Sequence, residues 1–159
     1  MKQLINLTRT ITLKTNNKHK EKKMVVKSRT ENLSEIREFI YSAAQDIGVP
    51  KEVIDDIILA VDEACTNIIK HAYKYYPDGE IIIKLKYNLH KFTIIIVDHG
   101  ASFEPDIVPD PDLEKYYEQR KVGGLGMYLM KRLMDEVKYI SIPGKYNQVL
   151  LSKNLNSAI

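Results

Sequence analysis

Three polar residues recur at helical spacing within the segment VDEACTNIIKHAY, residues 61–73. Glu63, Asn67 and His71 lie four residues apart, so on a helix they share one side and could form the floor of a chemical site. Periodicity alone favours the plainer interpretation, a solvated face opposite a buried one. The predicted buried face consists of Ile57, Ile58, Val61, Ala64, Cys65, Ile68, Ile69 and Ala72.

Two further segments carry groups that could bind a ligand. The sequence DHG at 98–100 follows a strongly apolar run, so its carboxylate would emerge where a buried strand ends, although Asp-x-Gly also forms ordinary turns. Gly123, Gly124 and Gly126 open a predicted helix. Glycines let a ligand approach backbone N–H groups, and a helix N-terminus favours phosphates. The alternative for the glycine cluster is a flexible hinge.

The elements that must position these groups follow from periodicity and turn residues. Apolar spacing predicts helices over 32–46, 51–73 and 123–137. β-branched runs and turns predict strands at 23–29, 80–88, 91–98, 138–142 and 147–153. This order predicts an α+β fold, a two-layer sandwich with a mixed, mostly antiparallel sheet and three helices on one face.

Composition limits the classes of protein that the chain could be. Its 159 residues suit one domain, and 44% hydrophobic with 28% charged residues is ordinary for a soluble protein. The single cysteine, Cys65, excludes an intrachain disulfide and fits a reducing compartment. The apolar runs are far shorter than the roughly 18 residues that span a bilayer. We therefore expect a soluble, cytoplasmic protein.

The first 23 residues differ in charge from the rest of the chain. They hold seven Lys or Arg and one Glu, a balance of +6, whereas the remainder holds 17 basic and 20 acidic residues, a balance of −3. The net charge therefore does not indicate a nucleic-acid-binding domain. We predict a basic extension at 1–23, disordered or forming an edge strand, and one domain at 24–159. A transit peptide and a translation start at Met24 are alternatives for the extension.

In combination, the three segments resemble the GHKL ATPase superfamily, which includes histidine-kinase catalytic domains, gyrase B and heat-shock-90 chaperones. EACTNIIKHAY is similar to the N box of this family, DHGASF to its G1 box and GGLGMYLMKRLMDEV to its G2 box. Within the superfamily, the chain is most similar to bacterial anti-sigma-factor serine/threonine-protein kinases. The resemblance covers residues 24–155. It implies a Bergerat-type ATP-binding fold in which residues 101–122, a proline-containing loop, form a mobile ATP lid.

The resemblance implies a site for ATP and Mg²⁺. Asp98 would accept a hydrogen bond from the exocyclic amine of adenine, and Gly100 would leave room for the base. Asn67 would coordinate Mg²⁺ through its amide oxygen. Glu63, one helical turn earlier, would be the general base that takes a proton from a protein hydroxyl as it attacks the γ-phosphate. His71 would have a structural or supporting role.

The same resemblance assigns the phosphate contacts to the glycine segment. Backbone amides of Gly123, Gly124, Leu125 and Gly126 would cradle the phosphates. Arg120, just before the glycines, would reach the γ-phosphate or a partner protein. These contacts would complete a closed site beneath the lid, from which water is excluded.

Two positions depart from the wider family pattern. Ser102 stands where other branches of the superfamily carry a second glycine, a variation that is usual in the anti-sigma-factor branch. The Thr of the last strand, which helps to hold adenine in the family, is replaced near the sequence NQV at 147–149. Gln148 is the candidate substitute for that adenine contact.

The resemblance implies a kinase that is also an anti-sigma factor. It would bind a sigma factor and phosphorylate an anti-anti-sigma protein of the STAS type, and we expect a homodimer without direct nucleic-acid or membrane binding. Two alternatives are a nucleotide-gated binding module without phosphotransfer and a stand-alone histidine-kinase-like ATPase domain. Glu63 argues against the first, because a pure binder needs no base. The short chain, without a phosphoacceptor hairpin, argues against the second.

Overall fold

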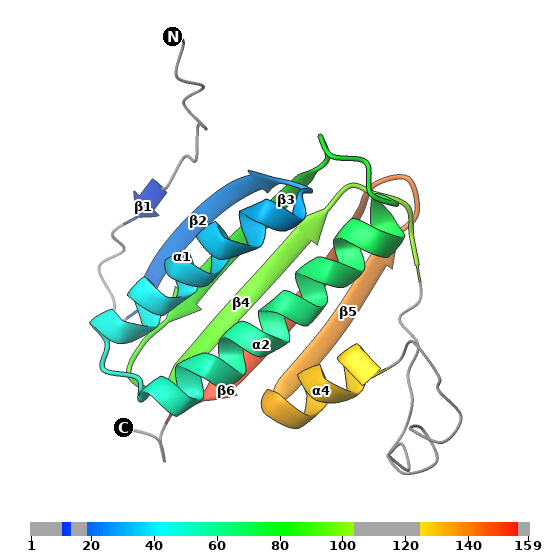
Figure 1. Ribbon diagram of the computed structural model, residues 1–159. Helices are drawn as coiled ribbons and strands as arrows, with labels where there is room; N and C mark the ends of the chain where they lie inside the picture. The colour runs from blue at the N-terminus through cyan, green and yellow to red at the C-terminus, as the bar shows by residue number, and fades with distance from the viewer. Residues whose placement is uncertain (1–10, 14–18, 104–124, 156–159) are drawn as a thin grey trace, which may run out of the picture.

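The computed structural model describes residues 11–13, 19–103 and 125–155, and these form two layers. A six-stranded sheet has the order β1-β2-β3-β4-β6-β5. Its strands are β1 (Ile11–Leu13), β2 (Lys20–Lys27), β3 (Glu80–Tyr87), β4 (Lys91–Asp98), β5 (Glu136–Ile142) and β6 (Tyr146–Asn154). One face is covered by α1 (Leu33–Asp46), α2 (Lys51–Asn67) and α4 (Leu125–Leu133), as Figure 1 shows. The predicted α+β sandwich is confirmed, but every described strand pair is antiparallel rather than mixed.

The hairpin of β3 and β4 forms the centre of the sheet and of the core. In β3, buried Ile81, Ile83 and Leu85 alternate with half-buried Ile82 and exposed lysines, which is the pattern of a strand with one covered face. In β4, the side chains that face the helices are fully buried. The register pairs Ile81 with Asp98, so the last residue of β4 lies beside the start of β3.

α2 presents its apolar face to the sheet, as its periodicity predicts. All the predicted buried residues are buried except Ile58, which is half-buried. Beyond Asn67, the prediction of a continuous α-helix is wrong. Residues Ile68–Ala72 (η2) form a wider π-helical turn, in which the N–H of Tyr73 reaches the carbonyl of Ile68 at 2.9 Å. Turns of this kind often occur beside functional sites.

α4 ends four residues earlier than its apolar spacing predicts. Leu133 is its last residue, and the predicted helical residue Val137 instead pairs with Leu151 in the ladder between β5 and β6. The N–H of Asp135 already donates to the carbonyl of Ser152 at 2.9 Å. Strand pairing with β6 therefore takes the backbone groups that a longer helix would use.

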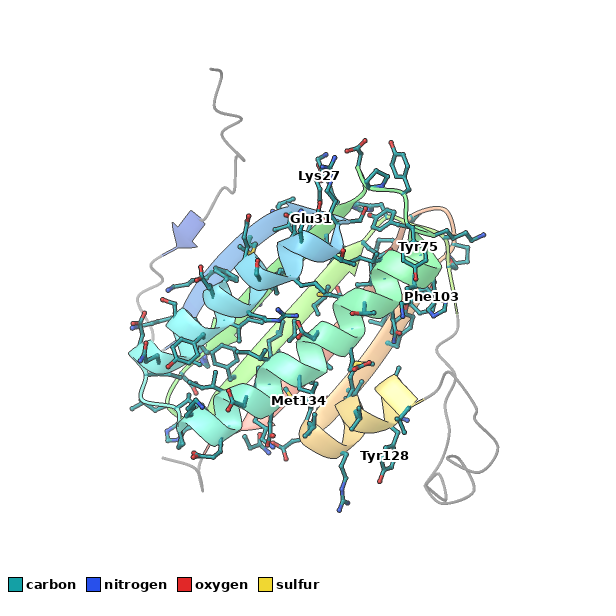
Figure 2. All side chains as sticks on the ribbon, in the orientation of Figure 1. Lys27, Glu31, Tyr75, Phe103, Tyr128 and Met134 are labelled. Carbon is teal, nitrogen blue, oxygen red and sulfur yellow. The ribbon has the colours of Figure 1, made fainter. Side chains whose placement is uncertain are left out.

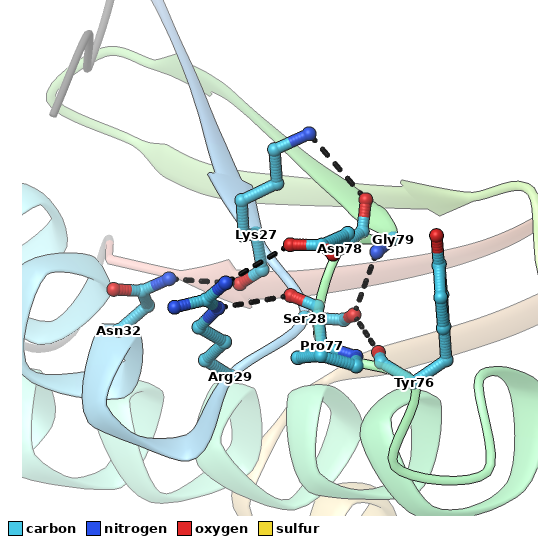
Figure 3. Close-up of polar contacts among 8 residues, drawn as sticks. All are labelled: Lys27, Ser28, Arg29, Asn32, Tyr76, Pro77, Asp78 and Gly79. Atoms are coloured by element: carbon cyan, nitrogen blue, oxygen red, sulfur yellow. Dashed lines mark hydrogen bonds and ion pairs between the residues drawn. The ribbon is translucent and has the colours of Figure 1, made fainter.

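Polar contacts fasten the loop after η2 to the end of β2 (Figure 3). The hydroxyl of Ser28 donates to the carbonyl of Tyr76 and accepts from the N–H of Gly79 at 3.0 Å. The guanidinium of Arg29 binds the carboxylate of Asp78 at 2.9 Å. These contacts hold the loop beside the start of β3, next to the end of β4.

The sheet begins before the predicted domain boundary. Lys20–Lys23 already pair with Lys84–Tyr87 of β3, so the expected boundary at residue 24 falls inside β2. Within the basic extension, β1 pairs with β2 as an outer strand. Among the residues that the structure describes, no helix is both long and apolar enough to cross a membrane.

Candidate functional site

A nearly fully buried carboxylate lies where β4 ends. Asp98 is only 1% exposed, and its Oδ1 accepts hydrogen bonds from the N–H of Gly100 and from Nδ2 of Asn147, both at 2.9 Å. Burial raises the pKa of Asp98 above its usual 3.8, and these two hydrogen bonds and the nearby His99 oppose that rise. Within the described residues no donor reaches Oδ2. That oxygen therefore suits a ligand that brings its own N–H group.

Gly100 lets the backbone after β4 pass close to η2. A Cβ at this position would lie 2.6 Å from the carbonyl carbon and oxygen of Ala72, so no other residue fits there without moving the backbone. The N–H of Ala101 donates to that same carbonyl at 2.8 Å. The close approach joins the G1-like segment to the end of the N-box-like helix. The expected further role of Gly100, leaving room for a base, stays a prediction.

The residue beside Asp98 on β6 is Asn147, and not Gln148, which the sequence offered as a candidate for the adenine contact. Register pairs Asp98 with Asn147 and Val97 with Gln148, so Gln148 faces the opposite side of the sheet. Asn147 is 1% exposed and contacts Asp98 directly. No local sequence signal distinguishes the two residues, because the answer depends on the register of β4 with β6.

Glu63 lies against the first turn of α4. Glu63 and Asn67 are both half-buried on α2, one turn apart, and α4 packs across α2. A Cβ at Gly126 would lie 2.6 Å from Oε2 of Glu63, so the glycine leaves space for the carboxylate. The predicted N-box and G2-box residues are therefore brought together. Leu125, the other described member of the predicted phosphate cradle, begins α4 beside Gly126.

Phe103 packs between η2 and β5. Its ring centroid lies 5.7 Å from that of His71 and 5.6 Å from that of Tyr139, and Figure 2 shows it beside the C-terminal end of α2. Beneath it is a cavity of about 10 Å³, lined by Asn67, Met127 and other largely apolar residues, which is too small for a nucleobase. The packing of His71 against Phe103 agrees with the structural role expected for that histidine.

Tyr139 also lines this cavity, and sequence reasoning missed it. Its hydroxyl is buried and has no hydrogen-bond partner in the described part of the chain. Burial, and then the charge of Asp98, raise the pKa of the phenol. An alternating strand at 138–142 predicts that one face is buried, but it does not identify the neighbours of the tyrosine.

Several predicted site residues lie outside the described residues. Arg120, Gly123 and Gly124 fall in the undescribed segment 104–124, as does most of the predicted lid. Among the described residues, no group of three His, Cys, Asp or Glu side chains could hold a metal ion. The amide oxygen of Asn67 is of a type that can bind Mg²⁺, which usually keeps several waters and phosphate oxygens in its coordination shell.

Residues 26–153 match the model of the histidine kinase-like ATPase domain. The chain belongs to this family. The Serine-protein kinase RsbW of Bacillus subtilis is 36% identical over 138 residues, which cover 84% of each chain. The protein of the same name from Bacillus pumilus is 36% identical over 140 residues, covering 84% of this chain and 85% of the relative. The Listeria monocytogenes protein is 34% identical over 117 residues, covering 71% and 73%.

Membership of this family confirms the resemblance that the three sequence segments indicated. The relatives are named as serine-protein kinases, which agrees with the branch of the superfamily predicted from the sequence. In this histidine kinase-like ATPase domain, the match runs from β2 to β6 and includes all three predicted boxes.

Proposed function

We propose that this protein is an ATP-dependent serine/threonine-protein kinase and anti-sigma factor of the cytoplasm. The observation that carries the proposal is the position of Glu63. Its carboxylate lies one turn before Asn67 and against the first turn of α4, where the family places the phosphates. A base at the phosphate end of a nucleotide site is useful for phosphotransfer, whereas a module that only binds nucleotide does not need one.

In this proposal, the adenine ring and the phosphates of ATP are held at opposite ends of the site. Asp98 accepts a hydrogen bond from the exocyclic amine of adenine, and the Asn67 amide oxygen holds Mg²⁺, which would neutralise charge on the phosphates. The phosphates lie against backbone N–H groups of the glycine segment, Gly123, Gly124, Leu125 and Gly126, with Arg120 beside the γ-phosphate.

Glu63 then has the central chemical role. It takes the proton of a protein hydroxyl while that oxygen forms a bond to the γ-phosphorus, and the bond from phosphorus to the bridging β-γ oxygen breaks. The products are ADP, a phosphoserine or phosphothreonine, and a protonated Glu63 that returns its proton to water.

The protein partners in this proposal are those that the family resemblance implies, and the names of the relatives as serine-protein kinases support a protein substrate. The protein would sequester a sigma factor and phosphorylate a STAS-type anti-anti-sigma protein, whose unphosphorylated form would displace the sigma factor. It would act as a homodimer, without direct contact to nucleic acid or membrane.

The test of this function is phosphotransfer from γ-labelled ATP to STAS proteins, with wild type and Glu63→Gln compared. The variant should transfer phosphate about 10²-fold more slowly, because it lacks the base. Its affinity for Mg·ATP should be unchanged or higher, because one negative charge near the phosphates is removed. Glu52→Gln is the matched control, since Glu52 is exposed in the first turn of the same helix, at its opposite end.

Two results would contradict the proposal in different ways. If Glu63→Gln transfers phosphate as fast as wild type, Glu63 is not the base. If the wild type binds ATP but phosphorylates none of the STAS proteins, the protein is better described as a nucleotide-gated binding module. Autophosphorylation on histidine would instead indicate a histidine-kinase-like ATPase.

A further inference from the structure

Asn147 joins three segments of the site through its side chain. Its Nδ2 donates to Oδ1 of Asp98 at 2.9 Å, and it also lies 3.3 Å from the carbonyl oxygen of Gly100 and 3.1 Å from that of Ala101. Its Oδ1 accepts a hydrogen bond from the hydroxyl of Ser141 on β5 at 2.6 Å. The amide therefore connects β4, the backbone after β4, and both strands at the far edge of the sheet.

The orientation of this amide is determined by its surroundings. The three atoms near Nδ2 are oxygens that can only accept hydrogen bonds when Asp98 is ionised. A flipped amide would place its Oδ1 against these oxygens and remove the hydrogen bonds that Nδ2 donates to them, which is costly for a residue that is 1% exposed. Ser141 supplies the donor for Oδ1 and completes the arrangement. Asn147 is thus a fixed donor directed at Asp98.

A fixed donor on one oxygen determines what the other oxygen of Asp98 can do. Oδ1 already accepts from both Asn147 and the N–H of Gly100. These two bonds set the rotation of the carboxylate, so Oδ2 is presented as the acceptor for an incoming N–H group. Without the amide of Asn147, the carboxylate could rotate and its charge would have one fewer partner.

We propose that Asn147, held in place by Ser141, is a positioning residue that gives this site its selectivity for the exocyclic amine of adenine. The inference rests on the proposed function, because it requires that ATP binds with its base at Asp98. Asn147 acts through Asp98 and does not touch the nucleotide in this role. Ser141 contributes by donating a hydrogen bond to Oδ1 of the amide, which holds the side chain in place.

The experiment compares ATP with purine riboside triphosphate, which lacks only the exocyclic amine. Wild type should bind ATP about 10-fold or more tightly than the analogue, the effect of one hydrogen bond to a charged group. Asn147→Ala should lose most of this preference, mainly by weaker binding of ATP. Asn147→Leu keeps a similar side-chain shape but has no hydrogen-bond donor, and should also lose it. Ser141→Ala should give a smaller preference than wild type.

Gln148→Ala is the matched control, because Gln148 is the next residue of β6 and faces the other side of the sheet. It should keep the wild-type preference. Thermal unfolding of each variant checks that it is folded, and if Asn147→Ala does not fold, Ser141→Ala decides, since that change removes only a hydroxyl. Unchanged preference in the folded Asn147 variants, or in Ser141→Ala if it must decide, would overturn the inference.

Other outcomes separate the inference from the proposed function. Equal weakening of both nucleotides in the Asn147 variants would indicate a merely structural role and also overturn the inference. If wild type binds ATP tightly but the Asn147 variants keep its preference for ATP over the analogue, the kinase proposal stands and the inference fails. If wild type binds neither nucleotide, the proposed function itself fails, and the inference fails with it.

Discussion

Asp98 carries a negative charge into a nearly fully buried position, and its two hydrogen-bond donors are a neutral amide and a backbone N–H. Burial of a carboxylate costs folding free energy, and here that cost raises its pKa. Because the pKa in the folded protein lies above the 3.8 of an exposed aspartate, the folded protein binds this proton more readily than the unfolded chain. Stability from this group therefore decreases as the pH rises through the interval between the two values.

Asp98→Asn should separate binding from folding. An asparagine removes the buried charge, so the melting temperature at pH 7 should be unchanged or higher. The affinity for ATP should fall about 10-fold or more, because the asparagine amide can direct an N–H group at the exocyclic amine of adenine, which is itself a donor. Calorimetric titration and thermal unfolding at pH 7 measure the two effects, and equal ATP affinity in variant and wild type would remove Asp98 from the site.

Gly126→Ala should displace the carboxylate of Glu63, since the new Cβ would lie 2.6 Å from its Oε2. Alanine favours a helix by about 1 kcal/mol over glycine, so a loss of activity would not come from a weaker helix. We expect phosphotransfer to fall more than ATP affinity does. In a Glu63→Ala background there is no carboxylate to displace, so the same change should have little further effect on the residual rate. A full effect in that background would show that Gly126 acts independently of Glu63.

At the scale of elements, Tyr73 connects the end of η2 with the strands that carry the site. Its hydroxyl donates to the carbonyl of Glu80 and accepts from the N–H of His99 at 3.0 Å. A cross-link of this kind fixes where the backbone after β4 lies relative to the helix. It adds to the contact between Ala101 and Ala72 on the same segment.

Tyr73→Phe should loosen this connection. Removal of both hydrogen bonds should lower the free energy of unfolding by about 1–3 kcal/mol and weaken ATP binding several-fold. Urea unfolding and calorimetric titration measure these effects. Tyr75→Phe is a suitable control, because the Tyr75 side chain is 63% exposed and should tolerate loss of its hydroxyl. An effect of similar size in the control would show that the loop is sensitive to any change.

Local patterns were sufficient to predict most of these elements. The face of α2 and the β3–β4 hairpin were predicted because each depends on residues close together in the sequence. The end of α4 was not, since Val137 fits a helical spacing but pairs with Leu151. That Asn147, and not Gln148, lies beside Asp98 could not be predicted for the same reason. A shift of one residue in strand register exchanges the two faces, and register with β4 is a non-local property.

At the scale of the whole molecule, β1, the described strand at residues 11–13 of the basic extension, is separated from the site. β1 occupies the outer edge of the sheet beside β2, whereas the site is built from α2, α4, β4 and β6, as the strand order requires (Figure 1). Only the outer edge of β2 depends on β1 for pairing. β2 and β3 therefore lie between β1 and β4, the nearest strand of the site.

Deletion of residues 1–18 should leave ATP affinity within about twofold of wild type, which calorimetry can measure. It should also expose the backbone groups of the β2 edge, so the shortened protein should associate more readily at high concentration. Light scattering at several protein concentrations checks this second effect. A large loss of ATP affinity would place the extension in the site after all.

The position of β6 has a consequence for synthesis of the chain on the ribosome. β6 lies between β4 and β5, although it is the last strand that the structure describes, and Asn147 follows Asp98 by 49 residues. At about 5–20 residues per second, the ribosome adds Asn147 about 2–10 s after Asp98. During that interval the nascent chain lacks the partner that orients the carboxylate. Selective nucleotide binding should therefore begin only when β6 has been inserted, and a chain terminated before β6 should be inactive rather than partly active.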